Sequence, residues 1–116
     1  MVLCIEQKQD AEIQRLLLAL QATPRFCKTG EEALAVARTQ PLTCIIAPLE
    51  MPDMSARALI ETLRTTAPGL ALIVIVDNPA VSEAVTVMRS GAHAVVDGRT
   101  LSSGLLQHLA PLLRNP

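Results

Sequence analysis

The chain has 116 residues, enough for one domain with its own core and too few for two. Half of the residues are hydrophobic and 18% are charged, which indicates a globular segment and excludes a disordered one. The net charge of -1 gives no electrostatic basis for binding nucleic acid, and the single aromatic residue, Phe26, cannot provide the stacked rings that bind bases or sugars.

Short apolar runs alternate with amphipathic helical patterns along the whole chain. The runs are rich in Val, Ile and Leu, which suits strands that are covered on both faces. Between them, apolar residues recur at i, i+3, i+4 and i+7, the spacing of one face of a helix. In chain order, the expected elements are a strand at 2–5, a helix at 10–22, a strand at 25–28, a helix from 29 to about 39, a strand at 43–47, a helix from 55 toward the turn at 68–69, a strand at 71–76, a helix at 78–90, a strand at 93–96 and a helix at 102–113.

Several helix boundaries carry their own signals. Thr29 and Glu32 have the spacing of a capping box, in which a hydroxyl and a carboxylate accept hydrogen bonds from amides at the helix start. Ser55 suits the N-cap of the next helix, and Asn78, which is followed by proline, suits the N-cap of the one after it. Gly91 stands where a glycine often ends a helix.

The alternation of strands and helices predicts an α/β fold, a three-layer doubly wound sandwich. Short connections between parallel strands require right-handed helical crossovers, so helices must cover both faces of the sheet. In sheets of this kind, function sits in the loops that leave the carboxyl ends of the strands. The stretch 44–54 runs from a buried strand through a proline-containing loop toward a helix, so it is the first place to look for chemistry.

Two segments resemble a known family. Met51-Pro52-Asp53-Met54 after an Ile-rich strand resembles the Asp-x-x-Met-Pro-x-Met loop of receiver domains in bacterial two-component response regulators. The strand at 74–76 and the Ala-Val-x-x-Met-x-x-Gly-Ala pattern over 84–92 resemble that family's fourth strand and fourth helix. The resemblance covers nearly all of 1–114. It implies a flavodoxin-like parallel sheet of order 2-1-3-4-5 and a single receiver-like domain over 1–116.

The same resemblance shows where the chain departs from the family. A receiver accepts a phosphoryl group on an aspartate four residues before the loop proline, and Pro48 stands at that position with no nucleophile to phosphorylate. Other residues of the family's phosphorylation machinery are also replaced. By the resemblance, Glu6-Gln7 stands where the family has its acidic metal-binding pair, and Val76 stands where it has the switch hydroxyl. Gly98 replaces the lysine, and Val95 replaces the aromatic switch residue. We therefore expect a pseudo-receiver without phosphoryl transfer, enzymatic activity, bound metal or cofactor.

The charged residues at the loop edge are open to two interpretations. Glu6 with Asp77 or Asp97 could form a repurposed cation site, and Arg99 could bind an anion such as a nucleotide phosphate. Alternatively, these residues, together with Glu50 and Asp53 on the central loop, are solvated loop charges, surface ion pairs and favourable charges at helix N-termini. The second interpretation is the simpler one.

The cysteines and histidines are expected to play no chemical part. Cys4, Cys27 and Cys44 are odd in number, widely spaced and inside predicted strands, so we expect buried thiols rather than disulfides or zinc ligands. A reducing cytoplasm is the expected compartment, because no signal peptide or membrane span is evident. His93 and His108 are expected to lie far apart, without a nearby nucleophile.

What remains for function is the surface. Receiver domains associate through the fourth helix, fifth strand and fifth helix, and the last helix here has more leucines than one buried face needs. A homodimer or docking to another domain is therefore expected. The corresponding candidate interface residues are Val87, Arg89, Ala94, Leu106 and Leu113.

The expected setting is a phosphorylation-independent regulatory domain at the N-terminal end of a transcriptional regulator. Contact with DNA would then belong to an output domain beyond Pro116, and no membrane is involved. A stand-alone adaptor is a close variant. The alternative class is a small-ligand sensor or enzyme that uses the loops around Glu6, Pro48, Asp77 and Arg99.

Overall fold

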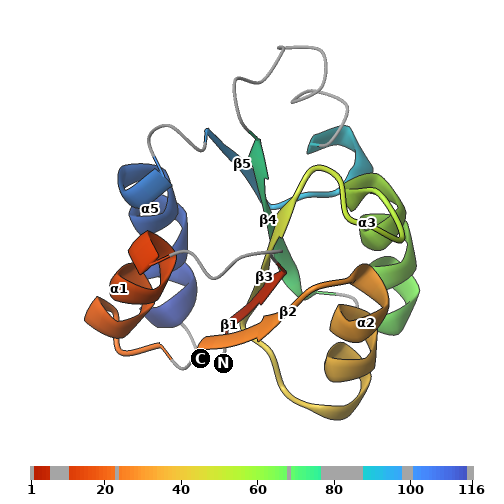
Figure 1. The fold of residues 1–116 in the computed structure, drawn as a ribbon, viewed down its shortest axis with the longest axis horizontal. Helices are drawn as coiled ribbons and strands as arrows, with labels where there is room; N and C mark the ends of the chain where they lie inside the picture. The colour runs from red at the N-terminus through yellow and green to blue at the C-terminus, as the bar shows by residue number, and fades with distance from the viewer. Residues whose placement is uncertain are drawn as a thin grey trace.

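The computed structural model of the chain describes residues 2–5, 11–22, 24–67, 69–76, 88–97 and 101–114, without the side chains of 11, 101–103, 105, 106, 113 and 114. Its centre is a five-stranded sheet (Figure 1). The strands are β1 Val2–Ile5, β2 Pro24–Cys27, β3 Cys44–Pro48, β4 Ala71–Val76 and β5 Ala94–Asp97. They are all parallel and lie in the order β2-β1-β3-β4-β5, which confirms the predicted fold class and strand order.

Helices cover both faces of this sheet, as the doubly wound topology requires. The described helices are α1 Ala11–Ala19, α2 Gly30–Thr39, α3 Ala56–Thr66 and α5 Leu101–Arg114. Figure 1 shows α1 and α5 together on one face and α2 and α3 on the other. Of the helix expected at 78–90, residues 88–90 are described, and they are helical.

The sheet divides the apolar core into two layers because successive strand residues point to opposite faces. Leu3, Ile45 and Val74 pack with the apolar residues of α2 and α3. Their neighbours in sequence, Val2 and Ile46 among them, pack with Ile13 and Leu17 of α1 and Leu109 of α5. The continuous apolar runs of the sequence follow directly from this burial on both sides.

The capping signals read from the sequence are present at α2 and α3. The Glu32 amide donates to Thr29 Oγ1 at 3.1 Å, and the Glu32 carboxylate accepts from the Lys28 amide at 3.2 Å. The capping box is therefore formed, although the Glu32 carboxylate bonds to the amide of Lys28, the residue before the N-cap, and not to that of Thr29 itself. At α3, Ser55 Oγ accepts from the Ala58 amide at 3.2 Å.

Helix α1 ends earlier than predicted. Its apolar pattern runs to Ala22, but Gln21 has a positive φ of 59° and the helix is regular only to Ala19. The Ala22 amide bonds to the Leu17 carbonyl and the Gln21 amide to that of Leu18, the pair of bonds of a Schellman motif. This backbone geometry ends the regular helix at Ala19, before the predicted end at residue 22.

The strand boundaries differ from the prediction by one residue at β2, β3 and β5. At β3 the difference matters, because Pro48 becomes the last strand residue rather than the first loop residue. No helix within the described ranges has both the length and the apolar character needed to cross a membrane.

Candidate functional site

The carboxyl ends of the parallel strands meet at one edge of the sheet, here called the carboxyl edge. Pro48 ends β3 and pairs with Ile75, and Val76 ends β4 and pairs with Asp97 at the end of β5. The structure thus brings Pro48, Val76 and Asp97 to the edge where the sequence placed them. Glu6, Gln7, Asp77, Gly98 and Arg99, the other predicted site residues of this edge, lie outside the described residues.

Pro48 fits the last position of β3 for a backbone reason. Proline lacks the N–H that a central strand normally donates. On the β4 side, the pairing of β3 continues to Pro48, its last residue. A proline at this end position leaves the N–H donors of the earlier β3 residues in place, and its ring is half-buried.

The groups at the ends of β3 and β4 are apolar. The Pro48 ring carries no oxygen or other nucleophile, so this position cannot accept a phosphoryl group. Val76 is 4% exposed and belongs to the core on the α2 and α3 side, so it offers no hydroxyl to an anion. Val95, the counterpart of the aromatic switch residue, packs partly buried against the same core.

The loop between β3 and α3 is closed by its own backbone. The Met51 amide donates to the Met54 carbonyl and the Ala56 amide to the Leu49 carbonyl, each at 2.9 Å. Glu50 forms an antiparallel bridge with Ser55, and its side chain is exposed. Met51, by contrast, is 8% exposed and anchors the loop in the core. The two ends of the loop are therefore held together at the start of α3.

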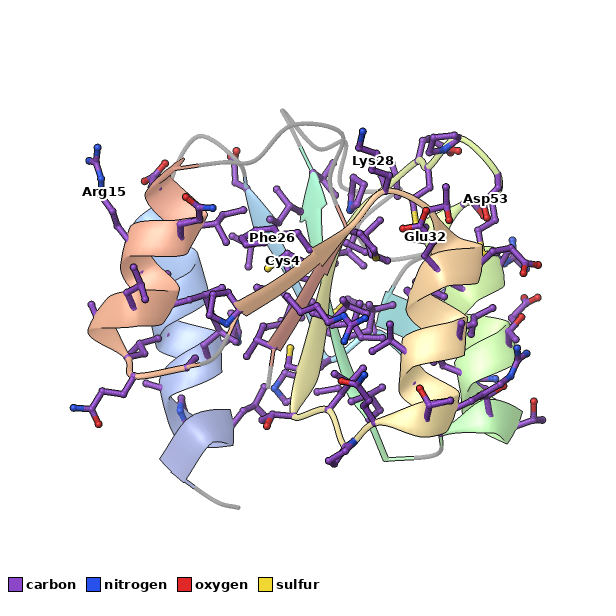
Figure 2. The ribbon with its side chains drawn as sticks, turned by 60° about the horizontal axis from the view of Figure 1, so that its bottom comes forward. Cys4, Arg15, Phe26, Lys28, Glu32 and Asp53 are labelled. Atoms are coloured by element: carbon purple, nitrogen blue, oxygen red, sulfur yellow. The ribbon has the colours of Figure 1, made fainter. Side chains whose placement is uncertain are left out.

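Asp53 connects this loop to another helix. Its Oδ1 accepts from the Gly30 amide and its Oδ2 from the Glu31 amide, both at 3.0 Å, at the start of α2. Figure 2 shows Asp53 beside Glu32 at this end of α2. The amide of Gly30, and after it that of Glu31, lowers the pKa of the Asp53 carboxyl because both stabilise its charged form. Asp53 is thus a helix N-terminal charge, the simpler of the two interpretations of the acidic residues.

The contact between loop and helix also depends on a glycine that the sequence analysis did not single out for this role. A Cβ on Gly30 would lie 2.7 Å from Cγ and 2.8 Å from Cε of Met54. Glycine at the first position of α2 therefore leaves the space that the Met54 side chain fills. The signal in the sequence is the glycine that lies between Thr29 and Glu32 of the capping box.

The resemblance to receiver domains implies a divalent ion at this edge, but the side chains that end β3 and β4 offer it no ligand. A hard cation such as Mg²⁺ needs several oxygen ligands. Pro48 supplies none from its side chain, and Val76 is a hydrocarbon. Asp53, one of the two acidic residues of the central loop, already places both of its oxygens on amides of α2. Pro48, Val76 and Asp53 therefore do not provide the oxygen ligands that Mg²⁺ requires.

The cysteines are buried and form no disulfide, as predicted. Burial raises the pKa of the Cys44 thiol to about 12. It also raises the pKa of Cys27, to about 11, with a smaller contribution from the nearby charge of Glu32. Thiols that stay protonated are poor nucleophiles, so Cys27 and Cys44 act as small apolar residues.

The prediction that His93 and His108 lie far apart is wrong. Their ring centroids are 6.3 Å apart and the rings are nearly perpendicular, at 87°. His93 immediately precedes β5 and His108 lies on α5, so the helix that packs on this strand brings them together. Sequence spacing could not reveal this contact. Among the described residues, no third His, Cys, Asp or Glu completes a three-ligand metal site.

Of the candidate interface residues, Arg89 is exposed and Ala94 is not. Ala94 is 3% exposed and packs in the core on the α1 and α5 side, which rules it out as a surface contact. Val87 and the side chains of Leu106 and Leu113 lie outside the described part of the chain. Helix α5 packs on α1 as well as on β5, which gives its apolar residues a second neighbour within the chain.

Comparisons with known proteins were made by sequence and by structure. No protein-family model matches the sequence, and no curated protein matches it. Solved structures match over almost the whole chain. A CheY-like response regulator receiver domain protein from Methanospirillum hungatei has 20% identity and a TM-score of 0.81, with 97% of this chain and 92% of that one covered.

Two further neighbours have the same architecture. The beryllofluoride-activated receiver domain dimer of NtrC4 has a TM-score of 0.86 at 20% identity, covering 97% of this chain and 95% of the other. The receiver domain of a sensor histidine kinase from Pseudomonas aeruginosa, with a magnesium ion coordinated in its active-site cleft, has a TM-score of 0.83 at 15% identity, covering 98% and 97%. The chain therefore has the fold of the receiver domains of response regulators.

Proposed function

We propose that this chain is a pseudo-receiver, a domain that signals through contact with another protein and accepts no phosphoryl group. The observation that carries the proposal is Pro48 at the carboxyl end of β3, the place where the resemblance to receivers puts the phosphoacceptor. A proline cannot be converted to an acyl phosphate. The domain thus acts as a binding module and not as an enzyme.

The surroundings of Pro48 support the same proposal. Asp53, one of the two acidic residues of the loop after β3, is bonded to two amides of α2 and so is not available to replace the missing carboxylate. The side chain of Val76 offers no hydrogen bond to a phosphate. The alternative of a ligand-binding or catalytic site at this edge uses the loops around Glu6, Pro48, Asp77 and Arg99, and of these four residues Pro48 is the one that the structure describes.

The partner is a protein surface, either an output domain that regulates transcription or a second copy of this chain. The homodimer is the first to test, because the structurally similar NtrC4 receiver domain was solved as a dimer. Light scattering at high protein concentration gives the mass directly. A mass equal to one protomer would remove the homodimer and leave docking to another domain.

Phosphorylation is tested by amide NMR and mass spectrometry. The protein is titrated with Mg²⁺ and beryllium fluoride, and separately incubated with acetyl phosphate. We expect unchanged amide shifts at Ile75 and Asp97, which flank the edge, and no gain of one phosphoryl mass.

The matched control is the Pseudomonas aeruginosa receiver domain under the same conditions. A hydroxylamine-labile phosphoryl adduct on this chain would show that another carboxylate has taken over the role of the missing aspartate, and the proposal would fail. Shifts confined to the carboxyl edge when a nucleotide is added would instead favour the ligand-binding alternative.

A further inference from the structure

Two hollows that share Arg64 lie beside α3. The first has a volume of about 200 Å³ and is lined chiefly by apolar side chains of Ile60, Leu63, Leu70 and Leu72. It opens where α3 ends and β4 begins, at the amino end of the sheet. A hollow of this kind can accept one apolar side chain of a partner.

The second hollow has a volume of about 360 Å³ and is cationic. Arg57 and Arg64 of α3 and Arg89 of the helical turn before β5 line it, together with Glu61 and Ser90. We call these five residues the α3 surface. Three cations and one carboxylate give it an excess of positive charge, in a chain whose net charge is -1. Figure 1 shows the turn at 88–90, in cyan, next to α3.

The arginines differ in how they are held. Arg57 pairs with Glu61 one helical turn away, at 3.4 Å, and both side chains are largely exposed. Within the described ranges, no carboxylate lies at ion-pairing distance from Arg64 or Arg89. Among the described residues, these two guanidinium groups thus have no carboxylate partner, and a guanidinium group suits the binding of a carboxylate.

Arg64 belongs to both hollows, and a glycine positions it. Gly91 has a φ of 118°, and a Cβ there would lie 3.1 Å from Arg64 Nη2 and 3.2 Å from Ile60 Cγ2. The Arg64 guanidinium thus lies directly over the Gly91 backbone, between the apolar hollow and the cationic one. This placement presents a cation immediately beside an apolar hollow.

We propose that the α3 surface and the adjoining apolar hollow bind an acidic peptide segment of a partner protein. Carboxylates of the segment pair with Arg64 and Arg89, and an apolar side chain enters the hollow lined by Ile60, Leu63 and Leu72. The apolar hollow favours a peptide over inorganic phosphate or a nucleotide phosphate, since neither of those would fill it. This inference stands apart from the proposed function, because it holds whether or not the domain can be phosphorylated.

The test is fluorescence anisotropy with the full 116-residue chain. The probe is a short fluorescein-labelled peptide in which glutamate and leucine alternate. We expect binding that weakens as salt is raised, because exposed charge pairs are screened. Arg64→Gln with Arg89→Gln should weaken binding about tenfold, the effect of losing two exposed charge pairs.

The matched control is Arg15→Gln with Arg38→Gln, which makes the same change in net charge on α1 and α2. This variant should bind the probe like the parent, and circular dichroism should show that both double variants are folded. The proposal fails if the two double variants lose binding equally, or if a peptide with glutamine for glutamate binds as well as the probe. It also fails if tripolyphosphate binds at these arginines and the peptide does not.

Discussion

The carboxyl edge and the α3 surface both carry exposed charges, but the protein uses those charges differently. At the carboxyl edge, Asp53 places both carboxylate oxygens on amides of α2, and Ser55 caps α3. At the α3 surface, Arg64 and Arg89 have no carboxylate partner among the described residues. The charge of Asp53 contributes to the fold, whereas the charges of Arg64 and Arg89 are the ones that we propose to bind a ligand. We therefore expect mutations at the carboxyl edge to lower stability and mutations at the α3 surface to weaken peptide binding.

Helix α3 joins the two regions, so the largest effect is expected at its buried face. Leu59 is completely buried in the core that α3 shares with the sheet. Leu59→Ala should lower the free energy of unfolding by about 2 to 5 kcal/mol, because it leaves a cavity. Urea denaturation measures this value. Leu18→Ala on α1, where the side chain is 66% exposed, is the control and should change stability by less than about 0.5 kcal/mol.

The next effect tests the contact between loop and helix. Gly30→Ala places a methyl group against Met54 and should cost about 1 to 3 kcal/mol through overpacking. The cost should be smaller in a Met54→Ala background, where the crowding side chain is gone. A double-mutant cycle from urea denaturation gives this coupling. If Gly30→Ala lowers the free energy of unfolding equally with Met54 and with Met54→Ala, crowding against Met54 is not the reason for the glycine.

A pH-dependent effect is expected at Asp53. Its pKa is lowered in the folded state, so its contribution to stability is present above the pKa of about 4 in the unfolded chain and is lost as the pH falls through the lower, folded pKa. Asp53→Asn should lower the melting temperature at neutral pH. The difference in melting temperature between this variant and the parent protein should disappear at acidic pH. Glu50→Gln, an exposed change in the same loop, is the control and should show no such difference.

The smallest effect on stability is expected at the α3 surface. Arg64→Gln with Arg89→Gln removes two exposed cations that have no described carboxylate partner, so the free energy of unfolding should change by less than about 0.5 kcal/mol. Urea denaturation tests this beside the Asp53 variant. A large loss of stability would mean that these arginines serve the fold, and the contrast between the two regions would disappear.

Most of the fold could be predicted from the sequence because its signals are local. Apolar runs locate the strands, and Thr29 and Ser55 mark helix starts by hydrogen bonds that span only three residues. The end of α1 was missed because it depends on a left-handed backbone at Gln21, a conformation that glycine or asparagine would usually signal.

The candidate site was predictable only where one residue decides the chemistry. A proline side chain cannot form an acyl phosphate, so Pro48 alone decides the chemistry at this position. The role of Asp53 could not be read in the same way, because its partner Gly30 lies 23 residues away in sequence. The contact between His93 and His108, the burial of Ala94 and the grouping of Arg64 with Arg89 likewise depend on how separate elements pack.

The bonds from Asp53 to α2 have a mechanical consequence. The loop that follows β3 is joined to the start of the preceding helix, so the second and third strand–helix units cannot separate without breaking two charge-assisted hydrogen bonds. Any event that pulled this loop outward would uncover the amides of Gly30 and Glu31. Motion at the loop would therefore propagate backward along the chain, toward α2.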